Sequence, residues 1–195
     1  MESPGTRERL ILAMSDALQR RGMNGIGLNE LLATARAPKG VLYHHFPGGK
    51  TELTVAAIEF TVTQMLARLE KVLARSADPV DGLVAWMSGA QKMLNESAFE
   101  CGCPLATVAL ESTADDTLIR AALTDAFTAI RARIAAALVA AGHARARAEG
   151  TAMLIVAAYE GGLLQSKVER SVRPMWQVSE TLVALLERDG VRGKT

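Results

Sequence analysis

The chain has 195 residues, enough for one large domain or two small ones. Hydrophobic residues make up 49% of it and charged residues 22%, which supports a sizeable core and argues against a disordered chain. The net charge of +1 alone neither favours nor excludes nucleic acid as a partner. The first 50 residues nevertheless hold seven Lys/Arg against four Asp/Glu, so the basic surplus lies at the N-terminus.

Neither the start of the chain nor its apolar stretches predict a membrane protein. No basic and then apolar leader opens the sequence, and charges interrupt the apolar stretches. Cys101 and Cys103 are too close for an ordinary structural disulfide, and no nearby cysteine or histidine completes a tetrahedral metal site. We therefore expect a cytoplasmic protein with no metal and no cofactor.

The N-terminal third of the chain predicts three short helices. Apolar residues from Leu10 to Leu18 follow helical spacing, and Gly22 is a suitable stop. A second helix is expected over residues 28–35 and a third over 38–46, where Pro38 suits the first turn. Two short helices joined by a tight turn and supported by a first helix form a helix-turn-helix unit.

Helical spacing continues through the remainder of the chain. The segments expected to be helical are 50–75, 78–95, 105–112, 115–141, 145–168 and 173–188, and residues 190–195 are an expected frayed tail. No alternating β pattern or internal repeat is present. The sequence thus predicts an all-α fold of about nine helices. Its expected domains are a DNA-binding domain in residues 1–50, which includes the start of the fourth helix, and a helical effector-binding and dimerisation domain in 51–195.

The third expected helix carries the chemistry that suits DNA. Lys39 and Gly40 offer a cation and a backbone that phosphate can approach closely, while Tyr43 and His44 can reach phosphate oxygens or base edges. Gly48, Gly49 and Lys50 then place amides and a cation at the start of the next helix, which is the geometry of an anion site. His45 has two interpretations, a DNA contact or packing against the first helix. A His44–His45 metal pair is disfavoured because adjacent helical residues point in different directions.

Residues 6–60 resemble the DNA-binding domain of TetR-family repressors. The resemblance rests on Leu42-Tyr43-His44-His45-Phe46 followed by Lys50, and Gly27-Leu28-Asn29, Pro38-Lys39-Gly40 and Phe46-Pro47-Gly48-Gly49-Lys50 look like the LmrA/YxaF-type subgroup. It implies a DNA-binding surface made of Asn29, Arg36, Lys39, Gly40, Tyr43, His44, His45 and Lys50. Arg36 stands where the family's turn usually has glycine, and two interpretations stay open: a reshaped turn, or an added phosphate contact.

The C-terminal part is similar to the same subgroup. Phe99-Glu100-Cys101-Gly102-Cys103-Pro104-Leu105 and Glu160-Gly161-Gly162-Leu163-Leu164 carry the likeness. It implies a homodimer that uses the last two long helices, with Gly161, Gly162, Leu163, Trp176, Leu182 and Leu186 as interface candidates. It also implies a pocket for a small hydrophobic effector, with aromatic compounds included in that class, for which the candidates are Met65, Leu69, Trp86, Met87, Met93, Cys103, Thr107, Phe127, Met153, Tyr159 and Gln165. Each candidate in both sets has plain core packing as its alternative.

These observations favour a ligand-responsive DNA-binding repressor. We expect a homodimer that binds a palindromic double-stranded operator, is released by its effector and has no membrane partner. One alternative is a repressor that senses oxidation through Cys101 and Cys103. A helical enzyme is the other, but Glu111, Glu160 and His143 form no recognisable nucleophile–base set.

Overall fold

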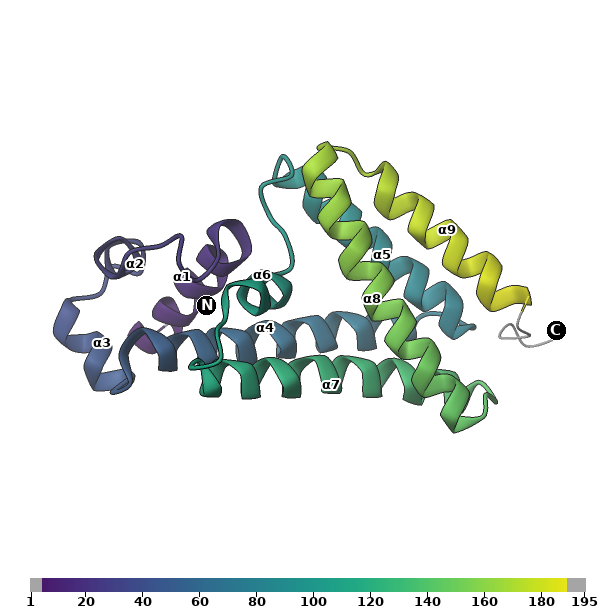
Figure 1. Ribbon diagram of the computed structural model, residues 1–195, viewed down its shortest axis with the longest axis horizontal. Coiled ribbons are helices and arrows are strands. Elements are labelled where there is room, and N and C mark those ends of the chain that lie inside the picture. Colours follow the sequence, from purple (N-terminus) through teal and green to yellow (C-terminus); the bar gives the residue numbers. More distant parts are fainter. Residues whose placement is uncertain (1–4, 189–195) are drawn as a thin grey trace. The chain divides into compact units, whose positions relative to one another are not determined.

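The computed structural model describes residues 5–188, and over these residues the chain is helical without strands (Figure 1). The helices are α1 (Thr6–Arg21), α2 (Leu28–Thr34), α3 (Lys39–His45), α4 (Gly49–Leu73), α5 (Pro79–Glu96), α6 (Pro104–Glu111), α7 (Thr117–Ala140), α8 (Arg145–Glu169) and α9 (Arg173–Arg188). The expected all-α fold of about nine helices is confirmed. The tail expected at 190–195 lies outside the described residues.

Local signals set several of these helix ends. The Asp78 carboxylate accepts the Val80 N–H at 2.7 Å and Pro79 follows in the first turn, which is a capped helix start. Gly22 ends α1 with φ at +78°, a conformation that residues with a Cβ adopt at a cost. Pro38 is the N-cap of α3 and lies just before the helix, rather than within its first turn as expected.

The helices form two compact units. Unit 1 contains the chain up to Thr63 together with Cys103–Ala126, and unit 2 contains Gln64–Gly102 and the chain from Phe127 onward. Helices α4 and α7 therefore contribute to both units, and α6 belongs to the same unit as the first three helices. The functional boundary near residue 50 stays a prediction.

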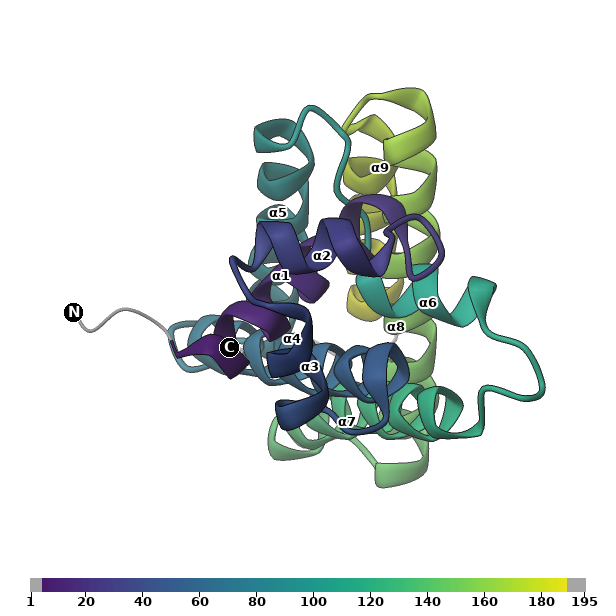
Figure 2. The same ribbon diagram turned by 90° about the vertical axis from the view of Figure 1, so that its left-hand side faces the viewer.

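The core of unit 1 holds the first three helices together. Leu10, Met14 and Leu18 of α1 are fully buried, as are Leu31 of α2 and Leu42 of α3. Phe46 closes this core at the end of α3, with the Arg7 guanidinium 5.3 Å from the centre of its ring. The three helices pack on one another, with α3 following α2 after a short turn (Figure 2).

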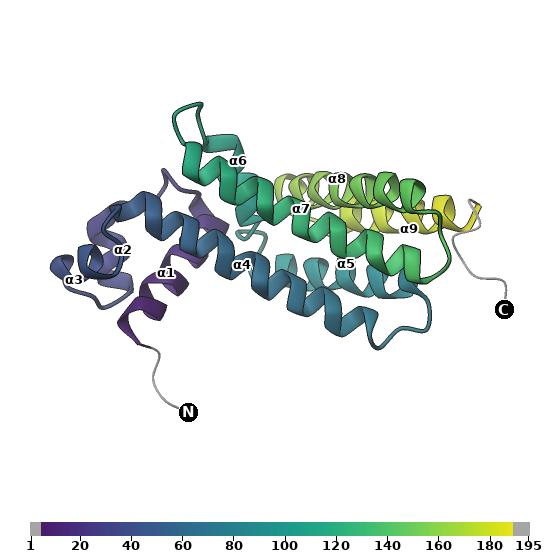
Figure 3. The ribbon, with the colours of Figure 1, turned by 90° about the horizontal axis from the view of Figure 1, so that it is seen from below.

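In unit 2, helices α5, α8 and α9 pack against one another, with α8 and α9 side by side (Figures 1 and 3). A Cβ on Gly162 of α8 would lie 2.9 Å from Met175 Sδ and 3.4 Å from Met175 Cα, so a larger residue there would have to displace the Met175 side chain of α9. The buried Ser166 hydroxyl accepts the Met175 N–H at 3.0 Å and fixes the start of α9 on α8. Within the same unit, Trp86 and Tyr159 stack with ring centres 4.2 Å apart.

An ion pair joins α4 to α7 within unit 2. The Arg133 guanidinium donates two hydrogen bonds to the Glu70 carboxylate, one of them 2.7 Å between Nη2 and Oε2. Hydrogen bonding from Arg133 lowers the pKa of Glu70 from its ordinary value. In the described part of the chain, no helix is both long enough and apolar enough to cross a membrane.

Candidate DNA-binding interface

Helix α3 turns one contiguous face toward solvent. Leu42 is fully buried and holds the helix on α1, whereas Lys39, Gly40, Tyr43 and His44 are all exposed. This spacing of one, three and four residues places them on one side of the helix. Tyr43 exposes 49% of its surface, so about half of its side chain is open to a partner. A Cβ on Gly40 would meet no atom within 4 Å, so the backbone there is open to a large partner.

The turn between α2 and α3 keeps a left-handed residue although it lacks glycine. Arg36 has φ at +49°, the Ala37 N–H donates to the Leu32 carbonyl at 3.0 Å, and the Arg36 N–H donates to the Ala33 carbonyl at 3.1 Å. These two bonds form the Schellman pattern that usually ends in glycine. The turn is therefore not reshaped, and the exposed Arg36 side chain lies next to the α3 face in the sequence.

At the start of α4, the expected anion site is occupied by the chain's own groups. The Glu52 carboxylate accepts the Gly48 N–H at 2.7 Å, and the Phe46 carbonyl accepts the Gly49 N–H at 2.8 Å. The Lys50 ammonium donates to the Ile26 carbonyl at 2.8 Å. Two of the donors expected to be open, the amides of Gly48 and Gly49, are therefore already used, and Lys50 also has a structural partner.

Asn29 and His45, the other two residues predicted for the DNA surface on α2 and α3, differ in exposure. Asn29 is exposed on α2. His45 is half-buried, with its ring centre 6.5 Å from that of Phe46 and 5.1 Å from that of His44. The exposure of Asn29 suits the predicted surface, whereas His45 shares the surroundings of the core residue Phe46.

Sequence reasoning missed two arginines of α1 that hold this domain. Arg9 Nε donates to the Ala35 carbonyl at 3.1 Å, at the end of α2, and Arg7 covers the Phe46 ring. Their helix carries a mixture of charges, so only the three-dimensional contacts separate these two from solvated arginines. Arg9 is bonded to the turn before α3, and Arg7 lies over the residue that ends α3.

The candidate pocket residues do not gather at one cavity. Cys103 and Thr107 belong to unit 1, and the other candidates belong to unit 2. Trp86 and Tyr159 form the buried stacked pair, while Gln165 is exposed and donates to the Gly161 carbonyl at 3.2 Å. The remaining candidates are buried (Leu69, Met87, Cys103), half-buried (Met65, Met93, Thr107, Phe127) or exposed (Met153).

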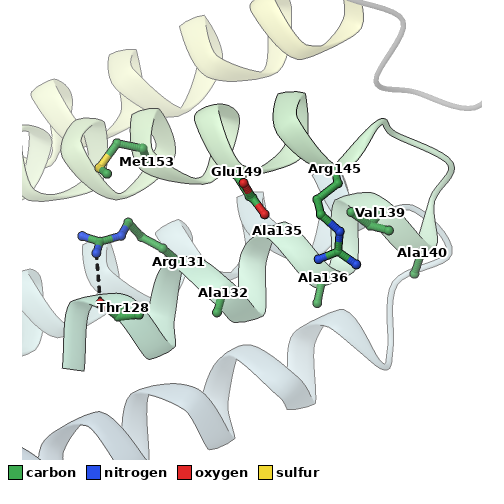
Figure 4. A pocket seen from close by; sticks show the side chains of 10 residues that line it. All are labelled: Thr128, Arg131, Ala132, Ala135, Ala136, Val139, Ala140, Arg145, Glu149 and Met153. Carbon is green, nitrogen blue, oxygen red and sulfur yellow. Dashed lines mark hydrogen bonds between the residues drawn. The ribbon is translucent and has the colours of Figure 1, made fainter. Parts of the chain in front are cut away.

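A groove of about 510 Å³ lies between α7 and α8, and Met153 is its only lining residue among the pocket candidates (Figure 4). Several of its lining residues are alanines, and the charged residues Arg131, Arg145 and Glu149 also line it. Arg131 donates to the Thr128 hydroxyl at 3.1 Å. Cys101 and Cys103 lie outside this groove and expose only 5% and 7%, and such burial disfavours them as sensors of oxidation.

The candidate interface residues divide into two groups. Gly162, Leu163, Leu182 and Leu186 are buried inside unit 2, so they are not available to a second chain. A Cβ on Gly161 would meet no atom within 4 Å, and Trp176 exposes 53% of its surface. The close helix approach expected at the glycine pair is therefore made, at Gly162, by the chain's own α9.

Known proteins match the chain over most of its length. Residues 79–181 match the family described as transcriptional regulator LmrA/YxaF-like, C-terminal domain. The HTH-type transcriptional regulator LmrA of Bacillus subtilis is 27% identical over 183 residues, which is 94% of this chain and 97% of that protein. The solved structure of the regulatory protein TetR from Rhodobacter sphaeroides matches with a TM-score of 0.80 at 26% identity, over 91% of this chain and 96% of that one.

A further solved structure, of the TetR-family regulator CifR with a 26-bp operator DNA, matches with a TM-score of 0.75. It is 21% identical and covers 94% of this chain and 98% of that chain, so it supports the fold alone. Together, the helix-turn-helix, its exposed α3 face and these relatives define a DNA-binding transcriptional regulator and not an enzyme. The chain belongs to the TetR family, in its LmrA/YxaF-like branch.

Proposed function

We propose that the protein is a homodimeric repressor that binds a palindromic operator through α3 and is released from it by a small hydrophobic effector. The observation that carries this proposal is the α3 face, where a cation, an open glycine and two polar-tipped rings are exposed together on a helix fixed by Leu42. Two such helices about 34–36 Å apart read two half-sites of one operator.

Binding to the region upstream of the protein's own gene tests the DNA contact. We expect fluorescence anisotropy to give tight binding to one fragment, with an affinity that falls steeply with salt. Tyr43→Phe and Lys39→Ala should weaken binding to every sequence, and Lys39→Ala should also reduce the salt slope by about one. His44→Ala should relax preference at one base position if its ring reads a base edge. Finding no specific site in low salt, there or elsewhere in the genome, would reject the proposal.

An apolar seam on α8 supports the dimer. Leu154, Ala157, Gly161, Leu164 and Val168 recur at alternating spacings of three and four residues, the repeat by which two helices pack along a seam. Leu164 exposes 57% and Val168 76% of their surfaces, although both are apolar. A second copy of the chain is the occupant that gives each seam an identical partner by twofold symmetry.

Analytical ultracentrifugation tests the seam with a matched pair of variants. Leu164→Asp places a charge on the seam and should convert the dimer to a monomer. Leu118→Asp makes the same change at an apolar side chain of α7 in unit 1 that is 65% exposed, and should leave the dimer intact. A Leu164→Asp protein that stays dimeric would place the interface elsewhere.

The stacked Trp86 and Tyr159 are the effector contact we favour, because planar aromatic compounds pack against such faces. The chain has two tryptophans, so Trp176→Phe leaves Trp86 as the single tryptophan, whose emission is followed by selective excitation of the indole ring. A planar aromatic compound that releases the operator should quench or shift Trp86 emission in this variant. A compound that releases the operator without changing that emission binds at another place.

A further inference from the structure

Glu111, the last residue of α6, bonds to the connection between α1 and α2. Its Oε2 accepts the Met23 N–H and, at 3.2 Å, the Asn24 N–H. Both amides follow the end of α1, where a helix connection leaves backbone donors without helical partners. One carboxylate from residue 111 thus satisfies two donors of the segment that leads into the helix-turn-helix.

The absence of a Cβ at Gly22 leaves room for this carboxylate. Its φ is +78°, and a Cβ built on it would lie 2.7 Å from Glu111 Cδ. An alanine there would collide with the carboxyl group as well as strain the backbone. The glycine at position 22 and the glutamate at position 111 therefore depend on each other.

The same connection is held from a second side. The Lys50 ammonium of α4 donates to the Ile26 carbonyl, three residues after Met23. Between these two attachments the connection turns at Gly25, where a Cβ would lie 2.9 Å from the Arg21 carbonyl carbon. Helix α2 begins at Leu28, directly after Ile26 and Gly27, so the position of the connection sets where α2 starts.

We propose that Glu111 is a positioning residue for DNA binding: it attaches the α1–α2 connection to α6 and so fixes the orientation in which α2 and α3 meet the operator. This inference rests on the proposed function, because it concerns the same DNA surface. Without the carboxylate, the Met23 and Asn24 amides turn to water and the connection gains freedom. The α3 face then keeps its side chains but loses part of its fixed orientation.

Operator binding by full-length variants tests the proposal. Glu111→Ala should raise the operator Kd about tenfold, the loss expected for one to two charge-assisted hydrogen bonds that hold the bound orientation. Glu111→Gln keeps an oxygen acceptor and should stay within about threefold of the unsubstituted protein. Glu59→Ala removes one negative charge from an exposed position of α4 in the same unit, and it corrects for the change in net charge.

Two readouts separate positioning from a general loss of stability. Affinity for non-operator DNA should change far less than affinity for the operator, because non-specific contacts do not need one fixed orientation. Hydrogen exchange in Glu111→Ala should accelerate at the Met23 and Asn24 amides, whereas the buried α1 amides should stay protected.

A double-mutant cycle with Gly22→Ala measures the dependence of the two residues. Backbone strain from alanine is present in both backgrounds, so it cancels in the cycle, and Gly22→Ala should weaken operator binding much less once Glu111 is alanine. Additive effects, or a Glu111→Ala protein that binds the operator as tightly as the unsubstituted one, would overturn the proposal. If the unsubstituted protein binds no operator in the same assay, the proposed function fails and the positioning role of Glu111 fails with it, whereas the outcomes above reject the positioning role alone.

Discussion

The two glycines of α5 give a prediction in which the same substitution has opposite effects. A Cβ on Gly89 would meet no atom within 4 Å, whereas one on Gly82 would lie 2.9 Å from Leu73 Cδ2 and 3.2 Å from Leu73 Cα. Alanine in an exposed helix interior is about 0.5–1 kcal/mol more favourable than glycine. Gly89→Ala should therefore increase the free energy of unfolding by about that amount.

At Gly82 the same gain is outweighed by overpacking. The Leu73 side chain can rotate away, but its Cα belongs to the backbone of α4, and a displaced backbone costs about 1–3 kcal/mol. Gly82→Ala should thus lower the free energy of unfolding by about 1 kcal/mol, and the two variants should differ by about 2 kcal/mol.

Urea denaturation followed by circular dichroism measures both variants at one protein concentration, since unfolding of a dimer depends on concentration. For a chain of this length a difference of about 2 kcal/mol corresponds to roughly 4–8 °C in Tm. A Gly82→Ala protein as stable as Gly89→Ala would refute the reasoning, because it would show that α4 yields to an added methyl group without cost.

Three further predictions concern charged residues. Arg36→Gly relieves a left-handed φ and should stabilise the protein by about 0.5 kcal/mol in thermal denaturation; if Arg36 also contacts phosphate, operator binding should weaken with a smaller salt slope. Lys50→Ala should lower the free energy of unfolding without DNA by about 1 kcal/mol, whereas the exposed Lys39→Ala should leave it unchanged. Hydrogen bonding from Arg133 lowers the pKa of Glu70 in the folded state. The contribution of Glu70 to the free energy of unfolding is therefore fully present above the pKa of the unfolded state, and it is lost as the pH falls through the pKa of the folded state. Glu70→Gln should accordingly flatten the fall in Tm below roughly pH 4.

Helices and their ends could be predicted from the sequence because their signals are local. The apolar spacing of α1, the Asp78-Pro79 start of α5 and the stop at Gly22 are each set by neighbours along the chain. The α3 face could be predicted for the same reason, since one buried Leu42 fixes which side of a seven-residue helix faces out.

The rest of the site depends on pairs distant in sequence. Gly162 carries no sign that its neighbour is Met175 of the same chain rather than a second subunit. Six apolar or small residues of α8 and α9 could have formed either the core or the interface, and only burial separates them. The seam on exposed α8 positions became visible once the inward face was known.

Most of the differences between the site predicted from the sequence and the site in the structure involve side chains that hydrogen-bond to backbone groups. Arg9, Lys50 and Glu111 each hold a connection in unit 1 through a carbonyl or an amide, and a backbone partner has no residue type to search for. A motif lysine beside glycines therefore resembles a pure phosphate ligand. The two roles of Lys50 are compatible, because an ammonium has three N–H donors and the Ile26 carbonyl takes one. A lysine anchored in this way would meet phosphate with less loss of side-chain entropy, so Lys50→Ala should weaken operator binding more than Lys39→Ala even after stability is corrected.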